Sequence, residues 1–332
     1  MKALQQVAHG DPAEAVKLVD LPDPVPRPGE VVIRMEAAAV HLADIKNFTG
    51  ERDFRAKFLP RIPGYEGIGR IVALGRGVTQ FNVGERVFPW WGAGTFAQLV
   101  CTPADKVMPA PEGDAQQLAL MLVNGFTAVS LLDDFVQLSP GQWLVQNGAN
   151  SNCGRYVIVL AQERGIRTCS IVRRAEVIDE LRALGADAVI LDHENPVELA
   201  ARVKAAIGEA EIKLGLDMVA GTATGRMMRC VSSGGVVVNY GFISGQPCEV
   251  HFNEVWQKEA TLRGMSAGRG LAQRSMDELR RVYAHLAQLI AGGQMRAAIA
   301  GTYTLDRATE AFRHALRTGA ERDGKIILLP NG

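Results

Sequence analysis

The sequence predicts an α/β protein built from a β-rich part and a doubly wound parallel sheet. Strand-like runs separated by Pro and Gly fill roughly the first 120 residues. From about Gly141 onward, strands and helices alternate five times, with Gly at the turns. This alternation is typical of a parallel sheet covered by helices on both faces. A length of 332 residues and a hydrophobic share of 47% allow two domains, each with its own core.

The first part begins with a turn-rich segment. Four prolines and a glycine between residues 22 and 29 keep the chain extended before a strand at Glu30 to Glu36. Further strands are expected at residues 68–74, 86–88 and 96–101. The first long helical period comes at residues 116–132. We therefore expect a compact unit of short strands.

The second part opens with an apolar strand at Trp143 to Gln146, a polar turn, and a helix at Arg155 to Arg164. The next strands are expected at residues 168–172, 188–191, 214–219 and 236–240. Helices are expected between them at residues 176–184, 197–207 and 222–230. The chain closes with helices at residues 273–291 and 308–318 and a strand at residues 325–329.

The composition argues against several classes of protein. The 36 basic and 36 acidic residues leave no basic excess for nucleic acid or an anionic membrane. No apolar run approaches the roughly 18 residues that cross a bilayer, and the first residues lack the apolar core of a signal peptide. The five scattered cysteines form no CxxC pair or Cys/His cluster, which predicts reduced thiols. We expect a soluble, cytoplasmic chain.

The turn at residues 147–154 is the first candidate site. It joins a strand to a helix, where backbone N–H groups and the positive end of the helix dipole can hold a phosphate. Gly148 and Gly154 match the dinucleotide fingerprint GxGxxG only weakly. An ordinary strand–helix turn is the alternative.

The next strand ends in Arg173 and Arg174, with no acidic residue before Glu176. A site for NAD usually has an acid here for the ribose hydroxyls, whereas the 2′-phosphate of NADP requires positive charge. Two guanidinium groups can bind that phosphate through charge-assisted hydrogen bonds. The pair therefore favours NADPH as the cofactor, and a solvated pair at a strand end is the alternative.

Nearly the whole chain carries segments that resemble one known family. In order, these are HLADIKNFTG (41–50), IPGYEGIGRIVALG (62–75), QNGANSNCG (146–154), IVRR (171–174), VNYGF (238–242) and GKIILL (324–329). They resemble the medium-chain dehydrogenase/reductase superfamily, and more narrowly its zinc-independent branch of 2-enoyl thioester (trans-2-enoyl-CoA) reductases and quinone oxidoreductases. The resemblance implies a GroES-like catalytic domain over residues 1–123, to which residues 268–332 return. Residues 124–267 are expected to form a Rossmann domain that binds NADPH.

The resemblance also implies which residues meet the cofactor. Asn124 and Thr127 are expected beside the nicotinamide. The turn residues are expected at the pyrophosphate, and the two arginines at the 2′-phosphate. The complete expected set is Asn124, Thr127, Asn150, Ser151, Asn152, Cys153, Gly154, Arg173, Arg174, Tyr240, Gly241, Phe242, Met265 and Lys325.

The resemblance predicts no metal. Zinc-dependent members carry Cys and His where this chain has Val40 and Tyr65, so only Glu66 of that ligand set is left. A lone carboxylate does not make a zinc site. His41, next to Val40, has its own alternatives: a ligand, or a polar residue at the inner edge of the domain.

The proton donor is the open point of the mechanism. Related enoyl thioester reductases have a tyrosine shortly after the segment NFTG, and this chain has Arg52 there. An arginine does not release its proton at neutral pH, although it can hydrogen-bond an enolate. Tyr65 is the nearest tyrosine in sequence. The catalytic candidates are therefore Tyr65, Arg52 and Asn124.

The resemblance, the arginine pair and the missing zinc ligands together predict a reductase. We expect NADPH-dependent reduction of the activated C=C bond of an enoyl thioester or related α,β-unsaturated carbonyl. An NADPH:quinone oxidoreductase is one alternative, and an NADPH-binding protein with little turnover is another. By analogy with the family, we expect a homodimer.

Overall fold

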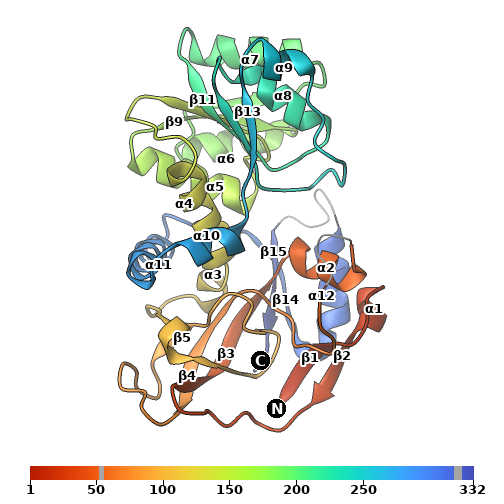
Figure 1. Ribbon diagram of the computed structural model, residues 1–332, viewed down its shortest axis with the longest axis vertical. Helices are drawn as coiled ribbons and strands as arrows, with labels where there is room; N and C mark the ends of the chain where they lie inside the picture. Colours follow the sequence, from red (N-terminus) through yellow and green to blue (C-terminus); the bar gives the residue numbers. More distant parts are fainter. Residues whose placement is uncertain (52–55, 318–323) are drawn as a thin grey trace. The chain divides into compact units, whose positions relative to one another are not determined.

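The computed structural model describes residues 1–51, 56–317 and 324–332. The chain divides into two compact units (Figure 1). Unit 1 consists of Met1–Val123 and Ser275–Gly332, and unit 2 of Asn124–Arg274. Unit 1 is thus assembled from both ends of the chain, whereas unit 2 is one continuous segment.

Unit 1 is built on a sheet that is antiparallel except for its parallel β14–β15 pair. Its main sheet has the order β14-β15-β3-β4-β5-β7, and β6 also pairs with β3. The strands are β3 (Glu30–Val40), β4 (Gly67–Leu74), β5 (Arg86–Phe88), β6 (Leu99–Pro103), β7 (Met108–Pro109), β14 (Ile299–Thr304) and β15 (Lys325–Leu329). A separate hairpin pairs β1 (Lys2–Gln6) with β2 (Val16–Asp20).

The C-terminal segment completes this sheet. Strand β15 pairs antiparallel with the end of β3, with Ile326 opposite Val40. Helix α12 (Ala308–Leu316) packs on the same core, where Phe312 lies 5.0 Å from Phe48 of helix α2 (Leu42–Thr49) between ring centroids. The remaining helices of unit 1 are α1 (Pro12–Ala15), α3 (Ala115–Leu118) and α11 (Met276–Ala291).

Unit 2 contains a six-stranded, all-parallel sheet with the order β10-β9-β8-β11-β12-β13. The strands are β8 (Trp143–Gln146), β9 (Arg167–Val172), β10 (Ala188–Leu191), β11 (Ile212–Asp217), β12 (Val236–Asn239) and β13 (Thr261–Gly264). The helices are α4 (Thr127–Asp133), α5 (Asn152–Glu163), α6 (Ile178–Ala183), α7 (Pro196–Ile207), α8 (Thr222–Cys230), α9 (Phe252–Trp256) and α10 (Ala267–Gln273).

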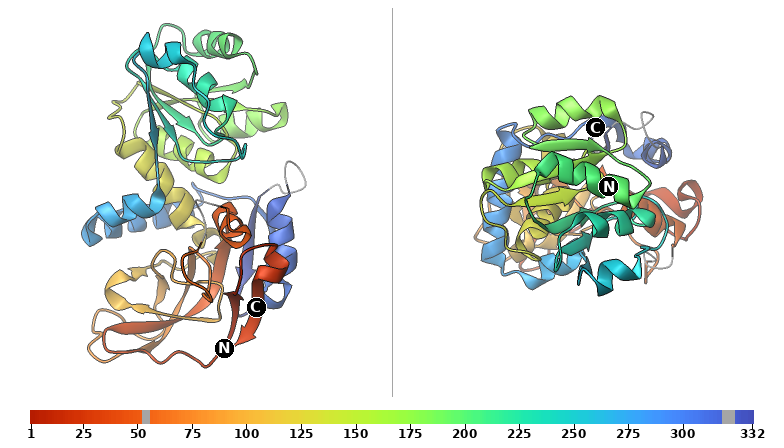
Figure 2. Two further views of the ribbon diagram at one scale, coloured as in Figure 1. Left: turned by 45° about the vertical axis from the view of Figure 1, so that its right-hand side comes forward. Right: turned by 90° about the horizontal axis from the view of Figure 1, so that it is seen from above.

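Helices cover both faces of this sheet, which is the doubly wound arrangement (Figures 1 and 2). Successive residues of a strand point to opposite faces. In β9, Ile171 packs in a core with Leu199 of α7, whereas Val172 packs in a second core with Leu181 of α6. The predicted α/β class, with a β-rich unit and a doubly wound parallel sheet, is confirmed.

The predicted helix at residues 116–132 is wrong as one continuous element. The chain forms α3, then a wide turn of π-type at Leu122–Phe126, and then α4. The N–H of Val123 donates to the Glu66 carboxylate, at 2.8 Å from Oε2, instead of to a helical carbonyl. Gly125 lowers helix propensity at the same point. The predicted strand at Glu30 to Glu36 is longer than expected and continues to Val40.

The second unit ends later than residue 267, where the sequence suggested a boundary. Helix α10 packs on α4 within unit 2, and Arg274 lies 4.8 Å above the ring of Phe126. Arg274 also pairs with Asp134 at 2.6 Å. The catalytic and cofactor-binding roles of the two units remain proposals.

Two expectations from the composition can be compared with the described residues. None of the helices formed by residues 1–51, 56–317 and 324–332 is long and apolar enough to cross a bilayer. All five cysteines lie within these ranges, and none of them forms a disulfide.

Candidate cofactor and catalytic sites

The carboxyl ends of the strands in unit 2 bring most of the predicted cofactor residues to one edge of the sheet. Because the strands are parallel, the residues that follow β8, β9, β12 and β13 emerge at the same edge. Backbone hydrogen bonds fix the order: Tyr240 N donates to Asp217 O at 2.9 Å, and Met265 N donates to Asn239 O at 2.9 Å. Open doubly wound sheets bind their ligands at this edge.

The turn at residues 147–154 requires both of its glycines. Gly148 has φ of +58°, in the left-handed region that favours glycine. A Cβ on Gly154 would lie 2.6 Å from the carbonyl oxygen of Ala149, so a side chain there would force the turn apart. The Ser151 side chain caps α5 by accepting from Gly154 N at 3.1 Å. The close approach presents the first turn of a 12-residue helix at the sheet edge.

The residues of this turn fit a phosphate group. Asn152 is 8% exposed, and its Nδ2 has no partner among the described residues. An unsatisfied buried donor is costly, and an anionic oxygen would satisfy it. The neighbouring backbone is held by Arg155, whose Nε donates to Asn150 O at 3.0 Å and which also pairs with Glu180. The donor and the positive end of α5 together favour an anionic ligand.

Close backbone packing continues at the residues after β12. A Cβ on Gly241 would lie 2.3 Å from the carbonyl oxygen of Met218, so only glycine fits there. The neighbouring Tyr240 hydroxyl is buried beside Cys153, and burial raises the pKa of Tyr240 well above its usual value. Cys153 lies in the first turn of α5, so this contact joins the predicted pyrophosphate and nicotinamide residues.

Asp217 organises this edge, and sequence reasoning missed it. It is fully buried at the end of β11 and accepts five hydrogen bonds. The donors are Asn147 Nδ2 (2.7 Å), Val219 N (3.0 Å), Ala220 N (3.2 Å), Thr224 Oγ1 (2.6 Å) and Asn239 Nδ2 (3.1 Å). The carboxylate therefore joins the ends of β8, β11 and β12. A polar residue that ends an apolar strand was the signal available in the sequence.

The arginine pair follows β9 directly. Arg173 is exposed and makes no ion pair within the described residues, whereas Arg174 is half-buried. The acid at the end of the next strand, Asp192, pairs with Arg226 at 3.0 Å. Asp192 therefore has a cationic partner of its own, and Arg173 has no acidic partner within the described residues.

Three further residues of the predicted cofactor set lie elsewhere. Asn124 and Thr127 are buried at the start of unit 2, in the wide turn and the first turn of α4. Lys325 begins β15 in unit 1, where burial lowers the pKa of His41 and the charge of Lys325 acts in the same direction. Arg52 lies outside the described residues. The structure thus gathers the candidates after β8, β9, β12 and β13, and it places Lys325 in the other unit.

A buried pair in unit 1 joins His41 to Glu66, the one residue left of the ligand set of zinc-dependent relatives. His41 Nε2 lies 2.5 Å from Glu66 Oε1, and the other carboxylate oxygen accepts from Val123 N. Burial lowers the pKa of His41, so the neutral ring donates to Glu66 at neutral pH. Both oxygens of Glu66 are thus in use. Within the described residues, no group of three or more His, Cys, Asp or Glu side chains could hold a metal ion.

Tyr65 lies next to this pair in sequence, just before β4. Gly64 positions it, because a Cβ at that residue would lie 2.4 Å from Thr95 Oγ1. The half-buried ring of Tyr65 lies 4.9 Å from that of Trp91 between centroids. Burial and the nearby Asp44 raise the pKa of Tyr65. The phenol therefore stays protonated at neutral pH, as a proton donor must.

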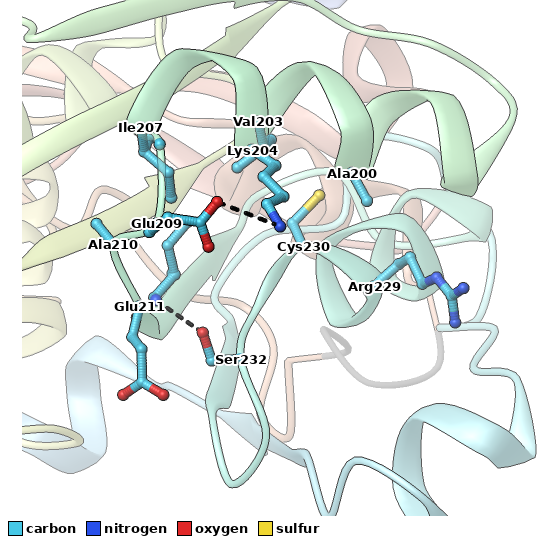
Figure 3. A pocket seen from close by; sticks show the side chains of 12 residues that line it. Ala200, Val203, Lys204, Ile207, Glu209, Ala210, Glu211, Arg229, Cys230 and Ser232 are labelled. Atoms are coloured by element: carbon cyan, nitrogen blue, oxygen red, sulfur yellow. Dashed lines mark hydrogen bonds and ion pairs between the residues drawn. The ribbon is translucent and has the colours of Figure 1, made fainter.

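The hollow drawn in Figure 3 lies away from these residues. It has a volume of about 320 Å³ and is lined by the end of α7, the start of β11 and the end of α8. Lys204 and Glu209 form an ion pair of 3.6 Å across it. The start of β11 is the edge of the sheet opposite to its carboxyl end, and none of the predicted site residues lines the hollow.

The fold and these residues match known proteins. Residues 27–112 match the alcohol dehydrogenase GroES-like domain, and residues 153–285 match the family described as zinc-binding dehydrogenase. The chain is 33% identical to the mitochondrial enoyl-[acyl-carrier-protein] reductase of Arabidopsis thaliana, over 89% of this chain and 80% of that protein. That relative is mitochondrial by name, and the cytoplasmic location of this chain remains a prediction.

Solved structures agree over almost the full length. A Bacillus thuringiensis protein assigned as an NADPH:quinone reductase has a TM-score of 0.90 and 25% identity, covering 99% of this chain and 98% of its own. A mycobacterial protein solved with NADPH has a TM-score of 0.85 and 26% identity, covering 99% of this chain and 100% of its own. The chain is therefore an oxidoreductase of the medium-chain dehydrogenase/reductase superfamily, and it belongs with the enoyl thioester reductases and quinone oxidoreductases.

Proposed function

We propose that the protein uses NADPH to reduce the activated C=C bond of an enoyl thioester. The observation that carries the proposal is the similarity to the enoyl-[acyl-carrier-protein] reductase, combined with a phosphate-compatible turn at Asn152. Arg173 and Arg174, at the end of β9, support the phosphorylated cofactor over NADH. The acceptor is a small molecule, and the zero net charge argues against nucleic acid and membranes as partners.

NADPH, when bound, supplies the hydride that adds to the β-carbon of the substrate. Asn150, Ser151, Asn152, Cys153 and Gly154 would hold its pyrophosphate, and the two arginines its 2′-phosphate. The nicotinamide end is assigned to Asn124, Thr127, Tyr240, Gly241, Phe242 and Met265, with Lys325 near the cofactor. All these assignments are proposals that follow from the family resemblance.

In this proposal, a residue of unit 1 supplies the proton. After hydride addition, the former C=C electron pair lies on the α-carbon and the thioester oxygen, and the α-carbon must take up a proton. We assign that proton to the Tyr65 hydroxyl, because its pKa is raised and the ring is only half-buried. Arg52 would hydrogen-bond the enolate or the acyl group, and Asn124 would orient the nicotinamide.

Initial rates of NADPH oxidation test this function. The acceptors are a short trans-2-enoyl-CoA, a benzoquinone, and buffer alone. We expect turnover with the enoyl-CoA well above the buffer rate, with formation of the saturated thioester. Turnover with the quinone alone would contradict the proposal.

The quinone activity remains a second candidate. Arg52 stands where related enoyl thioester reductases carry their tyrosine, and the similar Bacillus thuringiensis protein is assigned as a quinone reductase. A quinone can take its protons from solvent, so it needs no dedicated donor. Unchanged quinone turnover in a Tyr65→Phe variant, together with no enoyl-CoA turnover in the unmodified protein, would favour this candidate.

The double variant Arg173→Ala/Arg174→Ala tests the cofactor assignment. We expect the Kd for NADPH to rise roughly 100-fold, about 3 kcal/mol, because charge-assisted hydrogen bonds to the 2′-phosphate are lost. The Kd for NADH should stay within about twofold, because NADH lacks that phosphate. Fluorescence titration with both nucleotides measures this. Arg182→Ala, an exposed arginine on α6, is the matched control. Equal weakening for both nucleotides would refute the assignment.

The exposed edge of the sheet in unit 2 supports a homodimer. All four residues of β13 are exposed, and the strand pairs only with β12 within the described chain. Phe252 and Trp256 of α9 are 62% and 72% exposed. Unpaired strand edges and exposed aromatic residues are typical of contact surfaces. Sedimentation should give a particle of twice the chain mass of 35.8 kDa. A particle with the mass of one chain would contradict a dimer.

A further inference from the structure

One face of α2 buries polar side chains beside Tyr65. Asp44 and Asn47 lie three residues apart on this helix, which places them on the same face, and they are 0% and 7% exposed. Each has a side-chain oxygen without a partner among the described residues. Arg61, from the loop before Tyr65, also has a buried unpartnered nitrogen, Nη2. This helix face is therefore polar at considerable energetic cost.

Among the described residues, the Asn47 side chain makes a single hydrogen bond, and that bond goes to Tyr65. Its Nδ2 donates to Tyr65 Oη at 3.1 Å. The backbone of Asn47 is held independently, since its carbonyl accepts from Gln6 Nε2 at 3.0 Å and contacts His9 Nδ1 at 3.2 Å. The position of α2 thus does not depend on the Asn47 side chain. The role of the Asn47 amide is therefore its hydrogen bond to the hydroxyl of Tyr65.

The direction of this hydrogen bond decides what Tyr65 can do. A hydroxyl has one proton to donate and two lone pairs that accept. The amide of Asn47 uses a lone pair, and Tyr65 Oη donates to none of the residues that the structure describes. None of the described residues therefore takes the hydroxyl proton, which is left for donation to another group.

We infer that Asn47 is a positioning residue that aims the Tyr65 hydroxyl proton at the α-carbon of the substrate and supports the tyrosinate left behind. This inference rests on the proposed function, because it assigns a role within the proton step. In that step the O–H bond of Tyr65 breaks, and the electron pair of the enolate forms the new C–H bond at the α-carbon. The tyrosinate regains its proton from water. The Asn47 N–H strengthens its bond to the oxygen as negative charge develops there.

The electrostatics of the cluster agree with this role. Burial is the largest influence on Tyr65 and raises its pKa, and the charge of Asp44 acts in the same direction. The hydrogen bond from Asn47 opposes both and lowers the pKa. Without Asn47, the phenol would be a weaker acid in the same place.

Two substitutions of similar size test the hydrogen bond between Asn47 and Tyr65. One removes the bond, and the other reverses its direction. Asn47→Leu keeps the volume and removes the donor, and Asn47→Asp replaces the donor by an acceptor that captures the Tyr65 proton. We expect kcat to fall about tenfold for Asn47→Leu and about 100-fold for Asn47→Asp, with KM within about twofold. The solvent deuterium isotope effect on kcat should rise in both, because protonation becomes slower.

The same substitutions in a Tyr65→Phe background identify the partner. If Asn47 acts through Tyr65, both substitutions leave kcat of Tyr65→Phe unchanged. Equal losses in the presence and absence of Tyr65 would show a general structural effect and overturn the inference. Full activity of Asn47→Asp would also overturn it, because the amide would then accept the proton rather than donate.

A titration of Tyr65 keeps this inference distinct from the proposed function. The ultraviolet absorbance of the tyrosinate, taken as the difference from Tyr65→Phe, gives the pKa of Tyr65 without any substrate. Asn47→Leu should raise that pKa by about one unit, the equivalent of a tenfold change. An unchanged or lower pKa refutes the positioning role even if enoyl thioesters are reduced. A raised pKa supports the hydrogen bond even if they are not.

Discussion

Replacing Tyr65 by Phe is expected to lower kcat for an enoyl thioester by roughly 10²- to 10⁴-fold, the usual contribution of a positioned acid. The substitution removes one oxygen and keeps the ring against Trp91, whose centroid lies 4.9 Å away. Substrate binding should therefore change little, and KM should stay within about threefold. Steady-state rates of NADPH oxidation with a short trans-2-enoyl-CoA measure the effect.

Tyr303→Phe is the matched control in the same unit. Its hydroxyl lies 2.8 Å from His314 Nδ1 and belongs to none of the proposed sites. We expect full activity from this variant. Should Tyr65→Phe retain kcat as well, another group protonates the α-carbon, and the assignment of Tyr65 is wrong.

Replacing Asp217 by Ala is expected to destabilise unit 2 severely. The carboxylate accepts hydrogen bonds from two backbone amides and three side chains, and it is fully buried. Removing it leaves these donors without partners, each at a cost of roughly 1–3 kcal/mol. We expect the free energy of unfolding to fall by at least about 3 kcal/mol. Urea denaturation followed by circular dichroism measures this loss.

Asp179→Ala provides the comparison for this prediction. Asp179 is 96% exposed on α6 and pairs with Arg182 at 3.5 Å. Such a surface pair contributes within about 0.5 kcal/mol, so stability should hardly change. NADPH binding should weaken in Asp217→Ala, because the carboxylate joins three strand ends at the proposed cofactor edge. Wild-type stability in Asp217→Ala would mean that water or a rearranged turn replaces the carboxylate.

The fold was predictable where hydrophobic patterns are long. The alternation of strands and helices from Trp143 onward required only local periodicity and glycine turns, and it identified the parallel sheet. Strand β13 was not predicted, because all its residues are exposed and it has no apolar alternation. Helix α2 was also missed, because it is short and buries the polar residues Asp44, Lys46 and Asn47. Patterns of hydrophobicity carry no signal for such elements.

The candidate site likewise contains residues that local sequence patterns indicate and residues that such patterns miss. The turn ending at Gly154 and the arginine pair are local features, so the sequence alone was enough to propose them as candidates. The roles of Asp217 and Asn47 depend on partners far along the chain: Asn147 lies 70 residues before Asp217, and Tyr65 lies 18 residues after Asn47. Only folding reveals such contacts. The physical reason is that hydrogen bonds between side chains have no fixed spacing in sequence.

Isotope tracing in a single turnover tests the central claim most directly. The protein is mixed with a trans-2-enoyl-CoA and NADPH that carries deuterium at both positions of the nicotinamide C4, and the product is analysed by mass spectrometry and NMR. The account predicts a saturated thioester with one deuterium on the β-carbon and a hydrogen from solvent on the α-carbon. Recovery of unreduced enoyl-CoA, while the same NADPH is oxidised by a quinone, would contradict it.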